Sequence, residues 1–220
     1  MKKNCLFCLL LFFSCHSAFA DERLDSLLNV LDKTIKEADT YVQIKENKLH
    51  ELKKEARKTP PVSVERYHLN NDIYLEYKAY SSDSALHYLN ENMLLARQLN
   101  DKERELKIQL ELSYLLSSIG MYMEAADILN SIDRQTLPTS LLGHYYTCYE
   151  HVYSEAGAAQ PRYKMFASRY VKLSHVYRDS MEVTLDSSSA TYLWLRETQL
   201  REAGKYDEAM EFSDRRLAEA

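Results

Sequence analysis

Three side chains that can bind metal lie close together in the sequence: His144, Cys148 and His151. Their spacing of i, i+4 and i+7 would place all three on one face of a helix. Two imidazoles and a thiolate are ligands that zinc accepts, but a fourth ligand would have to come from elsewhere. Tyr145 and Tyr149 beside them are typical packing residues. We therefore favour two surface histidines beside a buried thiol and expect no metal or other cofactor, with zinc as the alternative.

Catalytic groups do not form a recognisable set. No serine or cysteine lies in a glycine-framed turn between a strand and a helix, where hydrolase nucleophiles are found. Paired acids such as Glu103 and Glu105, or Glu208 and Glu211, occur in charge-rich helical stretches, where solvated helix faces explain them. The sequence does not indicate an enzyme.

Composition restricts the fold. The 220 residues are 45% hydrophobic, which is enough for a substantial core, but they include only 4 Gly and 4 Pro. The glycines are too scattered for a phosphate-binding loop, and turn-rich all-β folds would need more of both residues. The formal charge of -5 and the lack of a dense basic run disfavour nucleic-acid binding. An all-α fold is expected.

The first twenty residues have the features of a secretory signal peptide. Lys2 and Lys3 precede an apolar run over 5–13, and Ala18-Phe19-Ala20 offers the small-x-small pattern that signal peptidase cleaves. The run is too short to span a bilayer. We predict cleavage after Ala20 and an exported, periplasmic protein; lipoprotein processing at Cys15 is the alternative. The mature chain then keeps Cys148 alone and has no internal disulfide.

Residues 21–58 show a heptad pattern. Apolar residues alternate at spacings of four and three, interrupted only by Lys45, at Leu24, Leu28, Leu31, Ile35, Ala38, Val42, Leu49, Leu52 and Ala56. One long helix is predicted, ending before Pro60-Pro61 because proline cannot donate to the preceding turn. The helix either packs along the rest of the chain or forms a homodimeric coiled coil. A linker over 59–64 would follow.

Residues 65–220 contain a repeated phrase. Gly120-Met121-Tyr122-Met123-Glu124-Ala125 and Gly204-Lys205-Tyr206-Asp207-Glu208-Ala209 share a turn glycine, an aromatic residue two positions later and an alanine three further on. A weaker version surrounds Ala85, and the spacing of the alanines predicts a degenerate copy near Ala167. The phrase resembles the centre of a tetratricopeptide repeat (TPR), in which two antiparallel helices approach closely at the alanine. The resemblance implies a TPR-like α-solenoid of about four helix pairs.

The order of signal peptide, long helix and TPR array also resembles the exported N-terminal sensor region of a family of membrane-anchored bacterial TPR regulators. That resemblance implies a membrane anchor and a cytoplasmic output region downstream of Ala220. In TPR arrays the first helix of each pair lines a concave groove. Registering three repeats on their turns predicts a binding surface there, formed by Tyr67, Asn70, Tyr74, Tyr77, Tyr114, His144 and His151.

Two functions are compatible with these features. The first is an exported module that binds a peptide, a protein or a small ligand in the groove and passes its occupancy to a transcriptional output. The second is a structural scaffold or adaptor that dimerises through residues 21–58. The sequence does not identify the partner.

Overall fold

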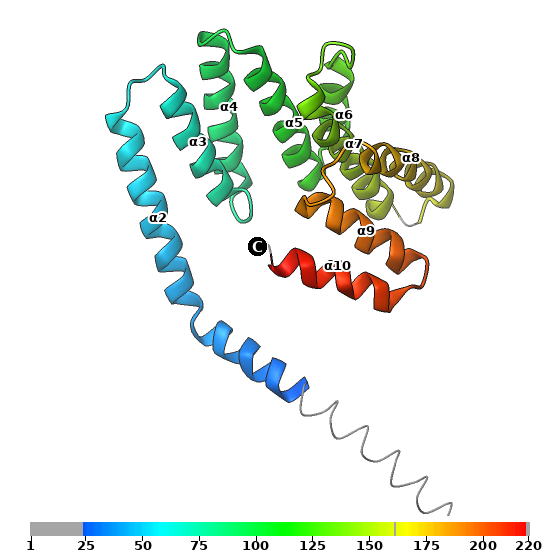
Figure 1. Ribbon diagram of the computed structural model, residues 1–220. Helices are drawn as coiled ribbons and strands as arrows, with labels where there is room; N and C mark the ends of the chain where they lie inside the picture. The colour runs from blue at the N-terminus through cyan, green and yellow to red at the C-terminus, as the bar shows by residue number, and fades with distance from the viewer. Residues whose placement is uncertain (1–23, 161, 219–220) are drawn as a thin grey trace, which may run out of the picture. The chain divides into compact units, whose positions relative to one another are not determined.

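The computed structural model describes residues 24–160 and 162–218, so the predicted signal peptide over 1–20 lies outside the described residues. Within these ranges the regular structure is helical and contains no strand, which confirms the predicted all-α class (Figure 1). The chain divides into two compact units, Met1–Leu52 and Lys53–Ala220. The boundary lies inside the predicted long helix rather than in the linker.

The helix predicted over 21–58 is not continuous, which corrects that prediction. Residues 24–36 are helical, the helix is interrupted at Glu37, and α2 then covers Ala38–Lys58. At the interruption the Thr40 amide donates to the Glu37 carbonyl, three residues back, at 2.9 Å. Asp39 in the first turn of α2 favours a new helix start, because a carboxylate stabilises the positive end of the helix dipole. The C-terminal end, before Pro60-Pro61, is where the sequence predicts it.

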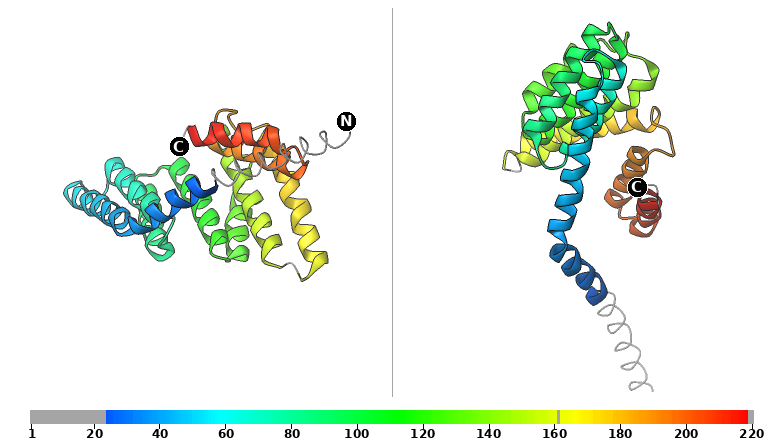
Figure 2. Two further views of the ribbon diagram at one scale, coloured as in Figure 1. Left: turned by 90° about the horizontal axis from the view of Figure 1, so that it is seen from below. Right: turned by 90° about the vertical axis from the view of Figure 1, so that its left-hand side faces the viewer.

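The second unit contains four consecutive helix pairs among its described residues, as predicted. These are α3 (Val64–Tyr77) with α4 (Ser82–Gln98), α5 (Lys102–Ser118) with α6 (Tyr122–Ser131), α7 (Thr139–Ala159) with α8 (Lys164–Glu182), and α9 (Ala190–Glu202) with α10 (Tyr206–Ala218). The two members of each pair pack against each other, and α5 also packs on α4 and α7. Figure 2 shows the pairs following one another in chain order from α3 to α10.

The turns inside the second and fourth pairs have the same backbone geometry. Gly120 and Gly204 adopt positive φ values of 88° and 75°, which a residue without a Cβ reaches at little cost. The next amide in each turn, that of Met121 or Lys205, donates at 2.9 Å to a carbonyl five residues back in the preceding helix. This closure explains why these two repeats have the clearest sequence signature.

The alanines of the repeated phrase are buried. Ala85 and Ala125 are 0% exposed and Ala209 is 2% exposed, in agreement with close approach of the paired helices. Ala167, near the predicted degenerate copy, lies on α8 but is only half-buried. In that pair a small residue of the other helix, Gly157, faces Tyr170 and Ala167 instead.

Candidate ligand pocket

The residues predicted to form one groove do not all lie together. Tyr114, His144 and His151 line a common pocket, whereas Tyr67, Asn70 and Tyr77 lie elsewhere and Tyr74 lies in the core. The pocket has a volume of about 460 Å³. It is lined by Lys78, Glu111, Tyr114, His144, Thr147, Glu150, His151, Ala190, Thr191, Trp194 and Arg216.

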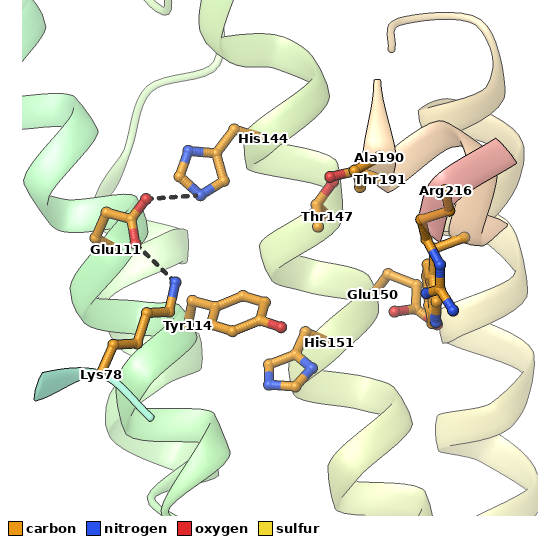
Figure 3. Close-up of a pocket in the computed structure, with 11 residues that line it drawn as sticks. Lys78, Glu111, Tyr114, His144, Thr147, Glu150, His151, Ala190, Thr191 and Arg216 are labelled. Carbon is orange, nitrogen blue, oxygen red and sulfur yellow. Dashed lines mark hydrogen bonds and ion pairs between the residues drawn. The ribbon is translucent and has the colours of Figure 1, made fainter. Parts of the chain in front are cut away.

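The helices α5, α7, α9 and α10 surround this pocket. Glu111 and Tyr114 come from α5, together with Lys78 just after α3, and His144 to His151 come from three turns of α7. The start of α9 and Arg216 of α10 form the opposite wall, as Figure 3 shows. The first helices of successive repeats therefore do line a concavity, as in the predicted groove.

Glu111 is the centre of a charged cluster on the first wall. Its Oε2 accepts a hydrogen bond from the Tyr74 hydroxyl at 2.6 Å. The same oxygen accepts from Lys78 Nζ at 3.2 Å, and the Glu111 Oε1 lies 3.7 Å from His144 Nε2 (Figure 3). Burial by itself would raise the pKa of Glu111, but the positive charge of Lys78, the interaction with His144 and the hydrogen bonds from Tyr74 and Lys78 lower it overall. Glu111 is therefore a carboxylate at neutral pH.

A stacked pair of rings lies next to that cluster. The rings of Tyr114 and His151 are 4.0 Å apart and inclined by 9°, and Lys78 Nζ lies 4.6 Å from the centre of the Tyr114 ring. His151 Nε2 is 2.9 Å from Ser118 Oγ. Burial lowers the pKa of both His144 and His151, only partly opposed by Glu111 and Glu155 respectively. Both imidazoles are therefore neutral at pH 7. The stacked rings of Tyr114 and His151 offer a flat aromatic surface.

Three ion pairs hold charged groups at and near the pocket, and Arg178 joins α7 to α9 through two of them. Glu150, 2% exposed, accepts from Arg178 Nε of α8 at 2.8 Å, and Arg178 Nη1 also donates to Glu202 at the end of α9 at 2.7 Å. Arg216 of α10 lies 3.0 Å from Glu197 of α9. The charges at the pocket thus already have partners within the protein.

Four of the predicted binding residues cannot act in this pocket as exposed anchors. Tyr74 is 0% exposed and supports Glu111 from the core, and Tyr67 is 3% exposed. Asn70, 5% exposed, lines a separate pocket beside α2 and α4. Tyr77 accepts a hydrogen bond from Lys53 at 2.5 Å and stacks on Tyr88. The register does not predict exposure on α3 because α4 packs against that helix and side chains of α5, such as Glu111, reach it.

Sequence reasoning missed much of the opposite wall. The register of the first three repeats does not extend to the fourth and so does not predict Thr191, Trp194 and Arg216, although the clear phrase at Gly204 is enough to locate α9. Lys78 and Glu111 were missed because each is separated from its partner by a repeat. No local spacing rule connects two residues 33 positions apart.

The three possible zinc ligands do not converge. Cys148 is 0% exposed, its Sγ lies 3.4 Å from the Leu110 carbonyl oxygen, and burial raises its pKa to about 12. A thiol in that environment is a poor metal ligand, because the thiolate is the binding form. In the described part of the chain no cluster of three or more His, Cys, Asp and Glu side chains could hold a metal ion.

The family comparison agrees with the array of helix pairs. The family model described as the SusR N-terminal TPR domain matches residues 35–220. The chain belongs to the SusR N-terminal TPR domain family. No curated protein and no solved structure gives a match.

Membership of the SusR N-terminal TPR domain family identifies a protein-interaction fold and relates the chain to a SusR-like sensor region. The match extends through all four helix pairs. Within the described ranges no helix is both long and apolar enough to cross a membrane.

Proposed function

We propose that the mature chain is the exported, ligand-sensing part of a membrane-bound transcriptional regulator, and that a peptide, protein or small ligand binds in the pocket between α5, α7, α9 and α10. One observation supports this most: the walls of the pocket come from different repeats, so one bound molecule would contact α5 and α7 on one side and α9 and α10 on the other. A ligand placed there can change how the last repeat packs.

The last repeat is suited to such a response. α9 and α10 pack closely on each other, but among the earlier helices their backbone approaches only α8. The rest of the attachment comes from side chains, including Leu195 in the core and ion pairs of Arg178 with Glu202 and of Arg196 with Glu182. Because α10 leads towards the anchor expected downstream, a shift of this repeat would carry the signal to the membrane.

The free polar groups of the pocket suit a polar ligand with an apolar face. No described residue hydrogen-bonds to the Tyr114 hydroxyl or to Trp194 Nε1, while the charged groups are paired internally. Aromatic rings that carry a polar group give contact area and a hydrogen bond at low entropic cost. A peptide offers both kinds of contact, because its backbone is polar and its side chains can be apolar.

Deletion of the gene in its host tests the regulator proposal. We expect a defined set of transcripts to change on deletion, and we expect the intact mass of the exported protein to correspond to cleavage after Ala20. An unchanged transcriptome would contradict the regulator, and a lipid on Cys15 would contradict the cleavage site.

The scaffold is a second candidate because one observation favours it. The apolar side chains of the heptad pattern are between 49% and 62% exposed at Leu24, Leu28, Leu31, Ile35 and Val42. An apolar stripe of this kind is typical of an interaction surface. In heptad notation Ile35 and Val42 occupy position a and Leu31 occupies position d. This distribution favours a coiled coil of two parallel helices.

Light scattering distinguishes this scaffold from a monomeric module. If the stripe is the dimer interface, Ile35→Asp converts a dimer to a monomer, and Lys33→Asp, a matched change on the same helix, leaves the dimer intact. A wild-type protein that is monomeric at high micromolar concentration would contradict dimerisation through residues 21–58.

A further inference from the structure

A second, smaller pocket lies beside α2, α3 and α4 and shares no residue with the one already described. Its volume is about 210 Å³. It is lined by Lys53, Ala56, Arg57, Arg66, Asn70, Ile73, His87, Tyr88 and Glu91. All of these residues belong to the second compact unit.

Asn70 is the unusual residue of this pocket. It is 5% exposed, and no described residue hydrogen-bonds to its carboxamide. Its carboxamide can both donate and accept hydrogen bonds, and Asn70 lines the open pocket. Asn92 on α4 differs from Asn70, since the Asn92 Nδ2 donates to the Tyr67 carbonyl at 3.0 Å while its Oδ1 is buried without a partner. The Asn70 amide is thus available to a molecule in the pocket.

Cations dominate the rest of the lining. Arg66 is held in place because its Nε donates to Thr59 Oγ1 and its Nη2 to the Thr59 carbonyl, both at 3.0 Å. Those two bonds use two of the five guanidinium N–H groups and leave three. Lys53 is held by its bond to Tyr77, and Arg57 is exposed and has no hydrogen bond or ion pair with another described residue. Glu91 is the one carboxylate against these three cations.

The local charge is therefore opposite in sign to that of the chain, which carries a formal charge of -5. Tyr88 reports on the same field: burial raises its pKa, while the positive charges of Lys53 and Arg57 lower it. We propose that this pocket binds a compact oxyanion, a phosphate or a carboxylate, through Arg66, Asn70 and Arg57. Arg66 and Asn70 form the preformed base of the site, and the exposed Arg57 closes over the anion.

The proposal does not depend on the sensing function. An orthophosphate ion is small enough for the cavity, and guanidinium groups bind oxyanions through paired charge-assisted hydrogen bonds. The same donors suit a carboxylate on a small molecule or on an acidic side chain. The shared chemistry is a compact oxyanion, and the experiment separates its sources.

Isothermal titration of the intact chain with sodium phosphate, against sodium chloride at equal ionic strength, tests the site. We expect saturable binding of one phosphate. Arg57→Gln should weaken it by about tenfold or more, because a charge-assisted hydrogen bond is lost. Asn70→Asp should abolish it by placing a carboxylate in the pocket. Arg169→Gln, the same change at an exposed site on α8, should leave it unaltered.

Acetate and a short glutamate-containing peptide separate the sources. Tighter binding of phosphate than of acetate identifies an inorganic or ester phosphate, and tighter binding of the peptide identifies an acidic side chain. The proposal is overturned if none of these anions gives more heat than chloride. It is also overturned if Arg57→Gln and Asn70→Asp bind phosphate as tightly as Arg169→Gln does.

Discussion

At the scale of single residues, the structure gives Tyr74 a different role from the one that the sequence predicts. Its position in the first repeat predicted an exposed anchor, but it is fully buried and its hydroxyl holds Glu111 at 2.6 Å. A tyrosine at a given helical register has the same appearance in either role, because the sequence does not say which helix will cover it. Tyr74 positions the Glu111 carboxylate of the pocket through its hydroxyl group.

Tyr74→Phe should therefore destabilise the protein. The change removes a hydrogen bond to a charged, mostly buried acceptor and leaves the ring in place, so the expected loss is about 1.5–3 kcal/mol in urea unfolding. Tyr163→Phe, at a side chain that is 65% exposed, is the control and should change the free energy of unfolding by less than about 0.5 kcal/mol. Equal effects of the two changes would mean that the Tyr74 to Glu111 bond does not form.

The two pocket histidines predict a pH dependence. Burial lowers the pKa of His144 and His151 in the folded chain, so the unfolded chain binds more protons as pH falls through about 6.5. Stability contributed by the neutral rings is present above that pH and is lost progressively below it, down to the lowered pKa values.

Melting temperatures between pH 7.5 and 5.5 measure this effect. We expect the melting temperature of the wild type to fall with pH and the fall to be shallower in His151→Gln. His175→Gln, at an exposed histidine on α8, should retain the wild-type slope. A wild-type melting temperature that rises on acidification would contradict neutral, buried imidazoles.

At the scale of elements, the local sequence signals were strongest where a turn closes a repeat. The glycine phrase located the α5–α6 and α9–α10 pairs, because positive φ and a close-approach alanine are local requirements. The interruption at Glu37 was missed, since the heptad pattern continues through it without change. Thr34, whose Oγ1 bonds back to the Val30 carbonyl at 2.9 Å, is a weak sign of a poorer helix there.

The close-approach alanines carry a prediction at this scale. Ala125 is 0% exposed between α5 and α6, so Ala125→Leu should overpack that pair and cost about 1–3 kcal/mol. Glu124→Gln, at the exposed neighbouring position, should change stability by less than about 0.5 kcal/mol. Denaturant melts of both variants give the comparison, and similar losses would show that the alanine is not confined by the facing helix.

At the scale of the whole molecule, the all-α class and four helix pairs followed from the sequence, whereas the pocket followed only in part. Tyr114, His144 and His151 were placed correctly beside one another because α5 and α7 obey the repeat register. The wall from α9 and α10 depends on how the fourth pair packs against the third. That packing is fixed by distant contacts such as Arg178 with Glu202, which no local pattern encodes.

A pocket-filling variant tests the central claim most directly. Thr191→Trp places a large ring in the pocket at the start of α9, and Met123→Trp places the same ring at a side chain that is 79% exposed on α6. In the host, with both variants folded and exported, we predict that Thr191→Trp reproduces the transcript changes of the gene deletion while Met123→Trp matches the wild type. Wild-type transcripts in the Thr191→Trp strain, together with a clear deletion phenotype, would contradict a regulator controlled through this pocket.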